Sequence, residues 1–332
     1  MAKFQHFGIA GAGAWGTALA VTLLRGGRDV SLWAHEKETV ADINQHHENK
    51  VFLPGVKLDA GLKATTGLAA LAGCDALILA VPAQHLRAIA KLLHKAGGGA
   101  PAIIVAKGIE QNSLALLSEV AADEMPDRAV AILSGPSFAG EIARGLPAAL
   151  TLAIRDQDLG QALAQAMALP QFRLYLSDDI IGAQIGGAVK NVLAVACGIA
   201  TGKKMGDSAR AALITRGLAE LVRLGTAMGG RAETLMGLSG LGDLVLTCSS
   251  PQSRNMSLGM ALGEGKSLEE ILGSRKSVSE GVYTASAALE LAKKHNVDMP
   301  VVMAVDAVLN RHADIDAMIA GLLARPLKPE RH

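Results

Sequence analysis

A lysine at position 190 stands in an almost wholly apolar part of the sequence, inside the segment 185–196 and next to Asn191. A lysine in such surroundings either extends its ammonium group to solvent or lines a site. A desolvated ammonium has a pKa lowered from ~10.4 towards neutrality, as a proton donor and acceptor requires. The small residues Gly186 and Gly187 indicate that another segment packs closely against this one. Lys190 and Asn191 are therefore candidate site residues.

A second candidate is an acidic residue in a glycine-rich turn. Asp243 follows the segment 238–242, and Thr247 and the run 253–255 come after it in a polar stretch. That run places Arg254 between a serine and an asparagine at a predicted helix start. A guanidinium group in this position can bind phosphate, because its paired N–H groups match phosphate oxygens. The alternative is a helix cap made by the serine or the asparagine.

The N-terminal motif Gly11-Ala12-Gly13-Ala14-Trp15-Gly16 directly follows the apolar run 7–10 and precedes a helical pattern over 17–24. This is the context in which G-x-G-x-x-G binds the pyrophosphate of a dinucleotide. The first glycine makes the tight turn, the second lets the backbone approach the pyrophosphate, and the third lets the helix pack on the strand. The N–H groups at the helix start then face the phosphates. The alternative is a strand–helix turn that binds nothing.

The end of the next predicted strand bears on which dinucleotide is bound. An acid about 20 residues after the motif would bind the ribose 2′-hydroxyl. The corresponding position is Ala34, with His35 and Lys37 beside it. The absence of an acid there favours NADP(H), whereas Glu36 is close enough to keep the pattern compatible with NAD(H).

Short apolar strands separated by helical segments must position these residues. The predicted strands are 7–10, 30–33, 75–81, 102–106, 129–133 and 149–154. Such a pattern is typical of an α/β fold with a doubly wound, parallel (Rossmann) sheet and right-handed crossovers. We expect this dinucleotide-binding domain over residues 1–180. Only helical patterns follow, so we expect an all-helical substrate and catalytic domain over 181–332; its helices are predicted at 178–202, 208–228, 257–262, 282–295 and 301–310.

Ligands of open α/β sheets bind outside the carboxyl ends of the strands. Here those ends lead into the segments 82–84, 107–110 and 134–139. Lys107 is either a solvated loop lysine or a cation of the site, and its place at a strand exit favours the site. The three loops are expected to converge where a nicotinamide and its substrate meet.

The bulk composition excludes several other classes of protein. The 332 residues are 50% apolar, and 32 basic against 31 acidic residues give a net charge of +1, so no global field calls for nucleic acid or a membrane surface. The N-terminus reaches Gly11 too soon to contain a signal peptide, and the mildly apolar stretch 185–201 is shorter than the ~20 residues of a membrane span. Cys74, Cys197 and Cys248 lack C-x-x-C spacing, which favours buried thiols in the cytoplasm. The histidines show no metal-binding spacing, so no metal is expected.

Taken together, these segments resemble the NAD(P)-dependent glycerol-3-phosphate dehydrogenases of the bacterial type. The glycine turn is generic, but Ser134-Gly135-Pro136-Ser137-Phe138-Ala139 and the segment Gly206–Gly217 are specific to that family. The resemblance also rests on the segments 106–110, 189–191, 240–244 and 253–255.

The resemblance implies the interconversion of dihydroxyacetone phosphate and sn-glycerol 3-phosphate for phospholipid synthesis, by a cytoplasmic homodimer. It implies Lys190 as proton donor and acceptor, accompanied by Asp243. The residues implied in substrate binding are Lys107, Gly135, Ser137, Asn191, Thr247, Ser253, Arg254 and Asn255. Those implied in dinucleotide binding are Gly11, Gly13, Ala14, Trp15, Gly16, His35, Lys107, Ala139, Arg254, Val278 and Glu280. Ala14 departs from the family pattern, in which serine is frequent, and the segment 277–281 matches it only loosely.

Two other readings compete with this one. The first is another two-domain NADP-dependent reductase, of the 6-phosphogluconate or 2-hydroxyacid type. The second is a dinucleotide sensor without catalysis. The joint presence of Lys190, Asp243 and Arg254 weighs against the sensor.

Overall fold

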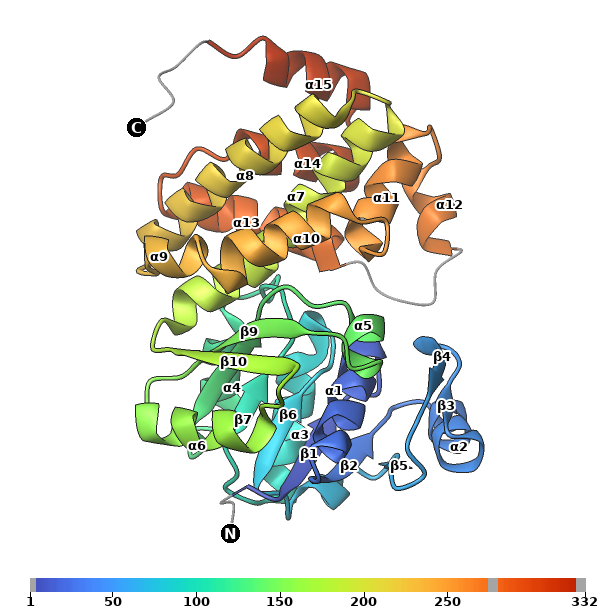
Figure 1. Ribbon diagram of the computed structural model, residues 1–332. Helices are drawn as coiled ribbons and strands as arrows, with labels where there is room; N and C mark the ends of the chain where they lie inside the picture. The colour runs from blue at the N-terminus through green and yellow to red at the C-terminus, as the bar shows by residue number, and fades with distance from the viewer. Residues whose placement is uncertain (1–3, 274–279, 327–332) are drawn as a thin grey trace.

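Eight strands form the main sheet in the computed structural model, which describes residues 4–273 and 280–326 (Figure 1). Their order across the sheet is β10-β9-β8-β7-β6-β1-β2-β5. Their bounds are β1 His6–Ala10, β2 Asp29–Trp33, β5 Lys63–Thr65, β6 Ala76–Leu79, β7 Ala102–Ile104, β8 Val130–Ser134, β9 Ala148–Ala153 and β10 Phe172–Ser177. The helices of this part are α1 Ala14–Arg25, α2 Lys37–Ala41, α3 Leu86–Ala96, α4 Leu117–Glu124, α5 Ala139–Ala143 and α6 Gln157–Met167.

The central strands are apolar throughout because helices cover both faces of the sheet. Successive side chains of a strand point to opposite faces. Accordingly, Phe7 and Ile9 of β1 pack in one core with α1 and α6, whereas Leu77 and Leu79 of β6 pack in another with α3 and α4. Across the sheet, the neighbouring strands β5, β2, β1, β6, β7 and β8 all pair in parallel. This confirms the predicted doubly wound fold.

The expectation of parallel pairing throughout is wrong at one place. β8 and β9 pair antiparallel, with Ile132 opposite Ala153 and Ser134 opposite Thr151. A parallel neighbour needs a crossover long enough to return along the sheet. The segment between these strands contains only the five-residue helix α5 within a loop, so the chain turns back instead. β10 then returns parallel to β9 by way of α6.

Four short or edge strands were not predicted. β10 lies at the sheet edge and mixes the exposed Arg173 and Tyr175 with apolar residues, so it lacks a buried apolar run. β5 has three residues. β3 (Glu48–Asn49) and β4 (Leu53–Lys57) form a separate antiparallel pair, which we call the β3–β4 insertion. Figure 1 shows it to the side of α1, away from the main sheet.

After β10 the described residues form helices and turns, as predicted. Helix α7 begins at Ile180 and ends at Gly202, in the middle of this helical part (Figure 1). The π-helical turn η4 spans Leu238–Gly242. The other helices are α8 Asp207–Ala227, α9 Ala232–Leu235, α10 Asp243–Ser249, α11 Arg254–Gly263, α12 Leu268–Gly273, α13 Glu280–Lys294, α14 Pro300–Arg311 and α15 Ile315–Leu323. The short helices α9, α10 and α12, and the exposed α15, were not predicted.

Helix α7 is the one described helix long and apolar enough to cross a membrane, but 89% of its most apolar stretch is buried inside the protein. It is therefore the core helix of the helical part. Its neighbours include α8, α10, α11, α13 and α14. The three cysteines of the chain are buried free thiols, two of them in this core, as predicted.

Glycines allow α7 and α11 to touch backbone to backbone. A Cβ on Gly259 of α11 would lie 3.0 Å from the Cα of Gly198 on α7, and one on Gly263 would lie 3.1 Å from the Cα of Gly202. Side chains at these positions would push the helices apart. This contact fixes α11, and with it the residues at its N-terminus, against α7.

We expect Gly259→Ala to lower stability by about 1–3 kcal/mol, because an added methyl group in a tightly packed contact forces the helices apart. Gly321 of α15 is the matched control, since a Cβ there would meet no atom within 4 Å. The Gly321→Ala variant should be unchanged or more stable by up to about 1 kcal/mol. Thermal unfolding measures both variants, and equal midpoints for the two would contradict the role of this contact.

Candidate active site

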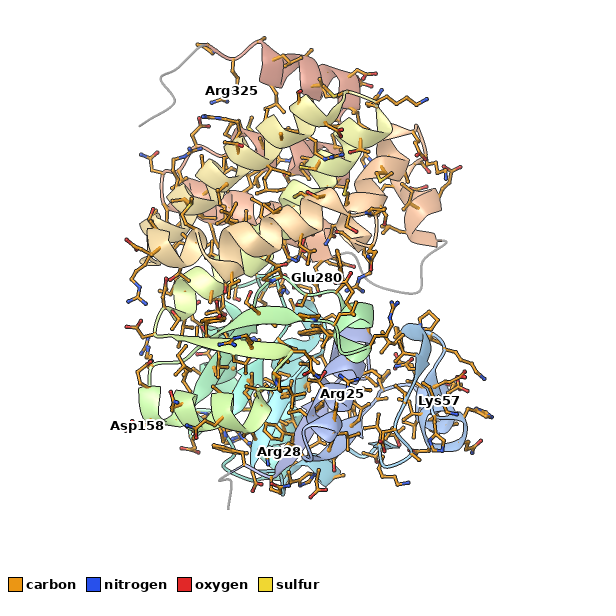
Figure 2. All side chains as sticks on the ribbon, viewed as in Figure 1. Arg25, Arg28, Lys57, Asp158, Glu280 and Arg325 are labelled. Atoms are coloured by element: carbon orange, nitrogen blue, oxygen red, sulfur yellow. The ribbon has the colours of Figure 1, made fainter. Side chains whose placement is uncertain are left out.

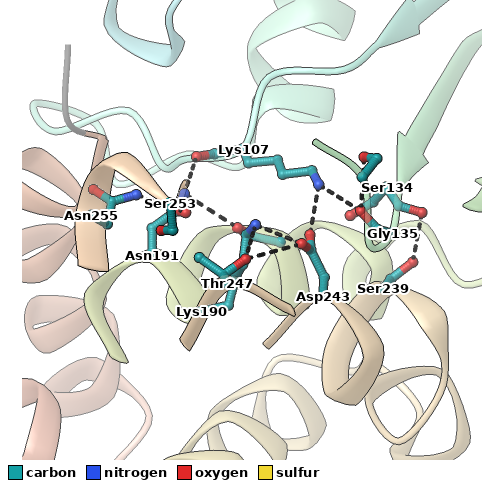
Figure 3. A network of polar contacts seen from close by, with 12 residues as sticks. Lys107, Ser134, Gly135, Lys190, Asn191, Ser239, Asp243, Thr247, Ser253 and Asn255 are labelled. Atoms are coloured by element: carbon teal, nitrogen blue, oxygen red, sulfur yellow. Dashed lines mark hydrogen bonds and ion pairs between the residues drawn. The ribbon is translucent and has the colours of Figure 1, made fainter. Parts of the chain in front are cut away.

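A buried carboxylate joins two lysines that come from different parts of the chain (Figure 3). Asp243 is 1% exposed. Its Oδ1 accepts a hydrogen bond from Lys190 Nζ at 2.6 Å, and its Oδ2 accepts one from Lys107 Nζ at 2.6 Å. Thr247 completes the group, since its Oγ1 accepts from Lys190 Nζ at 2.7 Å and lies 3.3 Å from Asp243 Oδ1. Lys190 and Asp243 of the helical part therefore meet Lys107 from the loop after β7, as the sequence predicted.

Small residues on α7 make this meeting possible. A Cβ on Gly187 would lie 2.8 Å from Ser134 Oγ and 3.3 Å from Lys107 Cγ. A Cβ on Gly186 would lie 2.9 Å from the carbonyl carbon of Ser239. The loop after β7, the end of β8 and the η4 turn thus pack directly on α7, one turn before Lys190. This is the close packing that the small residues indicated.

Burial and the neighbouring charges together set the protonation of Lys190 and Asp243. Burial and, secondarily, repulsion from Lys107 outweigh the attraction to Asp243, and together they lower the pKa of Lys190 to about 8. Burial alone would raise the pKa of Asp243, but the ammonium groups of Lys107 and Lys190 outweigh it and hold that pKa below its usual value. Asp243 therefore stays ionised, and Lys190 can change its protonation state near neutral pH.

A chain of side-chain amides runs beside this group. Asn191 Nδ2 donates to the carbonyl oxygen of Lys107 at 3.2 Å, and Asn255 Nδ2 donates to Asn191 Oδ1 at 3.0 Å. The N–H of Gly281 donates to Asn255 Oδ1 at 3.0 Å. The chain ties the loop after β7 to α7, α11 and α13. Asn191 and Asn255 are thus brought to the site, where their amides hold these elements together.

The segment after β8 supplies carbonyl and hydroxyl groups on the other side of Lys107. Lys107 Nζ donates to the carbonyl oxygen of Gly135 at 2.9 Å, and Ser137 Oγ donates to the same oxygen at 3.2 Å. Gly135 has φ +149°, and a Cβ there would lie 2.9 Å from the Cα of Leu150. A glycine is therefore required at this turn.

The run 253–255 forms the start of α11, and the structure shows the predicted serine cap there. Ser253 is the N-cap, since its Oγ accepts the N–H of Met256 at 3.2 Å. Arg254 is the first residue of the helix and its side chain is exposed. A cation at this place, beside the N–H groups of a helix start, suits an anionic ligand.

The glycine turn fits a dinucleotide. Gly11 has φ +121°, and a Cβ there would lie 2.7 Å from the Ala80 backbone, so the turn needs glycine. At Gly13, the N-cap of α1, a Cβ would meet no atom within 4 Å, which leaves this side open to a ligand. The buried Nε1 of Trp15 has no hydrogen-bond partner among the described residues. A pyrophosphate on the N–H groups from Gly13 to Gly16 matches this arrangement.

Other predicted dinucleotide contacts lie outside the lysine–carboxylate network. His35 is exposed just after β2, and its ring centre lies 6.3 Å from that of Trp33. Ala34, which stands where an acid would select NAD, is buried. Ala139 begins α5, which packs on α1. Val278 lies outside the described residues.

Glu280 lies where the sheet and the helical part meet (Figure 2). Its Oε1 accepts the N–H of Ala83 at 3.1 Å, and burial raises its pKa above the usual value. Its Oε2 is buried without a hydrogen-bond partner among the described residues, and so is Thr284 Oγ1. Glu280 thus meets the loop after β6 that the sequence placed along the nicotinamide.

Several polar residues of this region were missed by the sequence reasoning. Ser134 and Ser239 are 1% and 0% exposed, and Ser239 Oγ donates to the Ser134 carbonyl oxygen at 3.4 Å. Asn49, from the β3–β4 insertion, donates to the carbonyl oxygen of Ala12 inside the glycine turn. Ser134 and Ser239 lie inside the segments 134–139 and 238–242 that the sequence analysis named, so their positions gave a signal. Asn49 gave none, because its role depends on how the insertion folds back.

Comparison with known proteins identifies the family. A family model for the N-terminus of NAD-dependent glycerol-3-phosphate dehydrogenase matches residues 6–160, and one for the C-terminus of that enzyme matches residues 179–320. The chain belongs to this family. The resemblance noted in the sequence is thereby confirmed.

Individual members of the family match along nearly their whole length. The glycerol-3-phosphate dehydrogenase (NAD(P)+) of Parvibaculum lavamentivorans is 56% identical over 328 residues, which are 98% of this chain and 98% of that protein. The enzyme of the same name from Caulobacter vibrioides is 56% identical over 328 residues, which are 98% of this chain and 99% of that protein. The crystal structure of the Coxiella burnetii glycerol-3-phosphate dehydrogenase superposes with a TM-score of 0.94 at 38% identity, over 97% of this chain and 100% of that one.

We expect Asp243→Asn to lower the pKa of Lys190 below about 8, because the carboxylate attraction is lost while burial and the repulsion from Lys107 remain. The Lys190 ammonium would then lose its proton at a lower pH than in the wild type. NMR titration of labelled lysine side chains measures this directly. Asp316→Asn, which removes the exposed partner of Lys203, is the control and should leave Lys190 unchanged. An unaltered Lys190 titration in the Asp243 variant would refute this electrostatic account.

Proposed function

We propose that the protein is a glycerol-3-phosphate dehydrogenase that reduces dihydroxyacetone phosphate to sn-glycerol 3-phosphate with NAD(P)H, and catalyses the reverse reaction. The observation that carries the proposal is the Lys190–Asp243–Lys107 cluster, which lies where the helical part meets the loops after β7 and β8. The family membership supports the same activity, since the relatives named above carry it in their names.

Lys190 would act as the proton donor. Reduction of a ketone adds hydride to C2 and a proton to its oxygen, and the dinucleotide supplies the hydride when bound. The Lys190 ammonium gives its proton to the developing alkoxide and becomes a neutral amine; in the reverse direction, the amine takes the proton back. A pKa of about 8 suits both directions near neutral pH.

The neighbours of Lys190 would orient and stabilise rather than transfer protons. Asp243 and Thr247 hold the ammonium through hydrogen bonds of 2.6 and 2.7 Å. Lys107 brings a second positive charge, which stabilises negative charge on the reacting oxygen. Asn191 and Asn255 fix the distance between the loop after β7 and the helices. Together these groups preset the site before the substrate arrives.

Arg254 and its surroundings would bind the substrate phosphate. Arg254 is the first residue of α11, and Ser253 caps that helix. Gly135 and Ser137 would contact the rest of the substrate from the loop after β8. Binding energy from the phosphate then positions C2 without taking part in the chemistry.

On the dinucleotide side, the residues Gly11 to Gly16 would hold the pyrophosphate. His35, Ala139, Val278 and Glu280 are proposed as further contacts. NADP(H) is the proposed preference over NAD(H), because Ala34 is buried and uncharged and leaves a 2′-phosphate unopposed. We also propose a cytoplasmic homodimer in phospholipid synthesis, with one domain over residues 1–180 and the other over 181–332.

The test measures the oxidation of NADPH and of NADH, side by side, with dihydroxyacetone phosphate and with 2-ketoacids as substrates. With 6-phosphogluconate, which is itself oxidised, it measures the reduction of NADP+ and NAD+. We expect dihydroxyacetone phosphate to be turned over with a kcat/KM at least ~10²-fold above that of the other substrates, since each of them lacks part of the matched set of contacts. Turnover of another substrate instead would identify a different reductase. Binding of the dinucleotide with no turnover of any of them would favour a sensor.

We expect Arg254→Ala to raise the KM for dihydroxyacetone phosphate by about 10–100-fold, because hydrogen bonds between charged groups contribute about 1.5–3 kcal/mol. Arg155→Ala is the matched control, because that exposed arginine follows β9, which runs antiparallel to β8 and so ends away from the carboxyl ends of the parallel strands. Steady-state kinetics at saturating NADPH measures both. A KM that stays at the wild-type value in the Arg254 variant would exclude the phosphate-binding role.

A further inference from the structure

An asparagine outside the lysine–carboxylate network is bonded to the glycine turn. Asn49 is 1% exposed, and its Nδ2 donates to the Ala12 carbonyl oxygen at 2.8 Å and to Thr17 Oγ1 at 2.9 Å. Its Oδ1 accepts the N–H of Phe52 at 3.1 Å. Thr17 is fully buried, and its hydroxyl approaches the same Ala12 oxygen at 3.3 Å. Both ends of the amide are therefore engaged, one with the insertion and the other with the glycine turn.

The β3–β4 insertion delivers this amide from the side of α1. Figure 1 shows the insertion beside α1, and Lys57, labelled in Figure 2, marks the end of β4. Its inner residues Leu53 and Val56 are buried in the core that contains α1, and β4 packs on α1 and α5. The insertion is thus a packed element, and Asn49 is held in place by it.

The planarity of the peptide bond converts this contact into a constraint on the binding groups. The Ala12 carbonyl and the Gly13 N–H belong to one trans peptide unit, so they point in opposite directions. With the carbonyl bound to Asn49, the Gly13 N–H points away from the insertion. Gly13 itself borders open space, since a Cβ there would meet no atom within 4 Å. Asn49 therefore sets the direction of a donor at the start of α1.

We propose that Asn49 is a positioning residue for the dinucleotide: its amide holds the Ala12–Gly13 peptide so that the N–H groups of the turn are preset for the pyrophosphate. Donors fixed in advance need no ordering when the ligand binds, which increases affinity. The proposal rests on the proposed function to the extent that a dinucleotide is the ligand. It assigns Asn49 no contact with the reacting atoms.

Asn49→Asp and Asn49→Ala test the proposal in the full-length protein. Aspartate keeps the shape but cannot donate to the Ala12 carbonyl, and alanine removes the contact without burying a charge. We expect the Kd for NADPH, measured by calorimetry, to rise about tenfold in both, as the loss of one buried hydrogen bond predicts. The kcat and the KM for dihydroxyacetone phosphate at saturating NADPH should stay within about twofold, because transition-state contacts are untouched.

Asn44→Asp is the matched control within the same segment. Asn44 bridges to Ala64 on β5, with its Nδ2 donating to the carbonyl oxygen and its Oδ1 accepting the N–H, both at 2.9 Å. This variant loses a similar amide donor that does not touch the glycine turn, so its NADPH affinity should equal that of the wild type. Melting temperatures with and without NADPH establish that each variant is folded.

Unchanged NADPH affinity in a folded Asn49→Ala variant would overturn the proposal, and so would an equal loss of affinity in Asn44→Asp. A fall in kcat with unchanged affinity would also overturn it, because the effect would then lie in the chemistry. Failure of the wild-type protein to bind either NADPH or NADH is a different result, which refutes the proposed function itself.

Discussion

Two ammonium groups from different parts of the fold share the carboxylate of Asp243, with hydrogen bonds of 2.6 Å on each of its oxygens. Without the negative charge of Asp243 between them, the two ammonium groups would repel each other in this poorly solvated site. The cluster carries one positive charge in excess when both lysines are protonated, which complements an anionic substrate and a developing oxyanion. The remainder of the site is arranged around this balance of charge.

The balance depends on close packing between the sheet and the helical part. Gly187 lets the end of β8 and the loop after β7 reach α7, Gly186 lets the η4 turn do the same, and the glycines of α11 let that helix lie directly on α7. The amides of Asn191 and Asn255 then tie these elements to α13. A small shift of any one element would separate the lysines from the carboxylate. The abundance of glycine and alanine in this apolar chain is thus linked to the site as well as to the core.

Much of this arrangement could be predicted from the sequence, for physical reasons that differ between residues. The glycine turn and the buried strands have strong local patterns, and Lys190 was conspicuous as a charge in an apolar helix. The antiparallel β9 could not be predicted, because its direction follows from the length of the connection and not from its own apolar run. Asn49 looked like any polar loop residue, since its partner Ala12 lies 37 positions away. Contacts made by an insertion that folds back leave no local pattern.

The central claim, that Lys190 gives the proton to the substrate oxygen, is tested most directly by the single-turnover rate of dihydroxyacetone phosphate reduction in a Lys190→Ala variant. The account predicts a loss of at least ~10²-fold with dinucleotide affinity nearly intact, as expected when a general acid is removed. Lys294→Ala, which changes an exposed lysine of α13, should react at the wild-type rate. Added small primary amines should restore part of the lost rate in the Lys190 variant. An unchanged rate in Lys190→Ala would contradict the account.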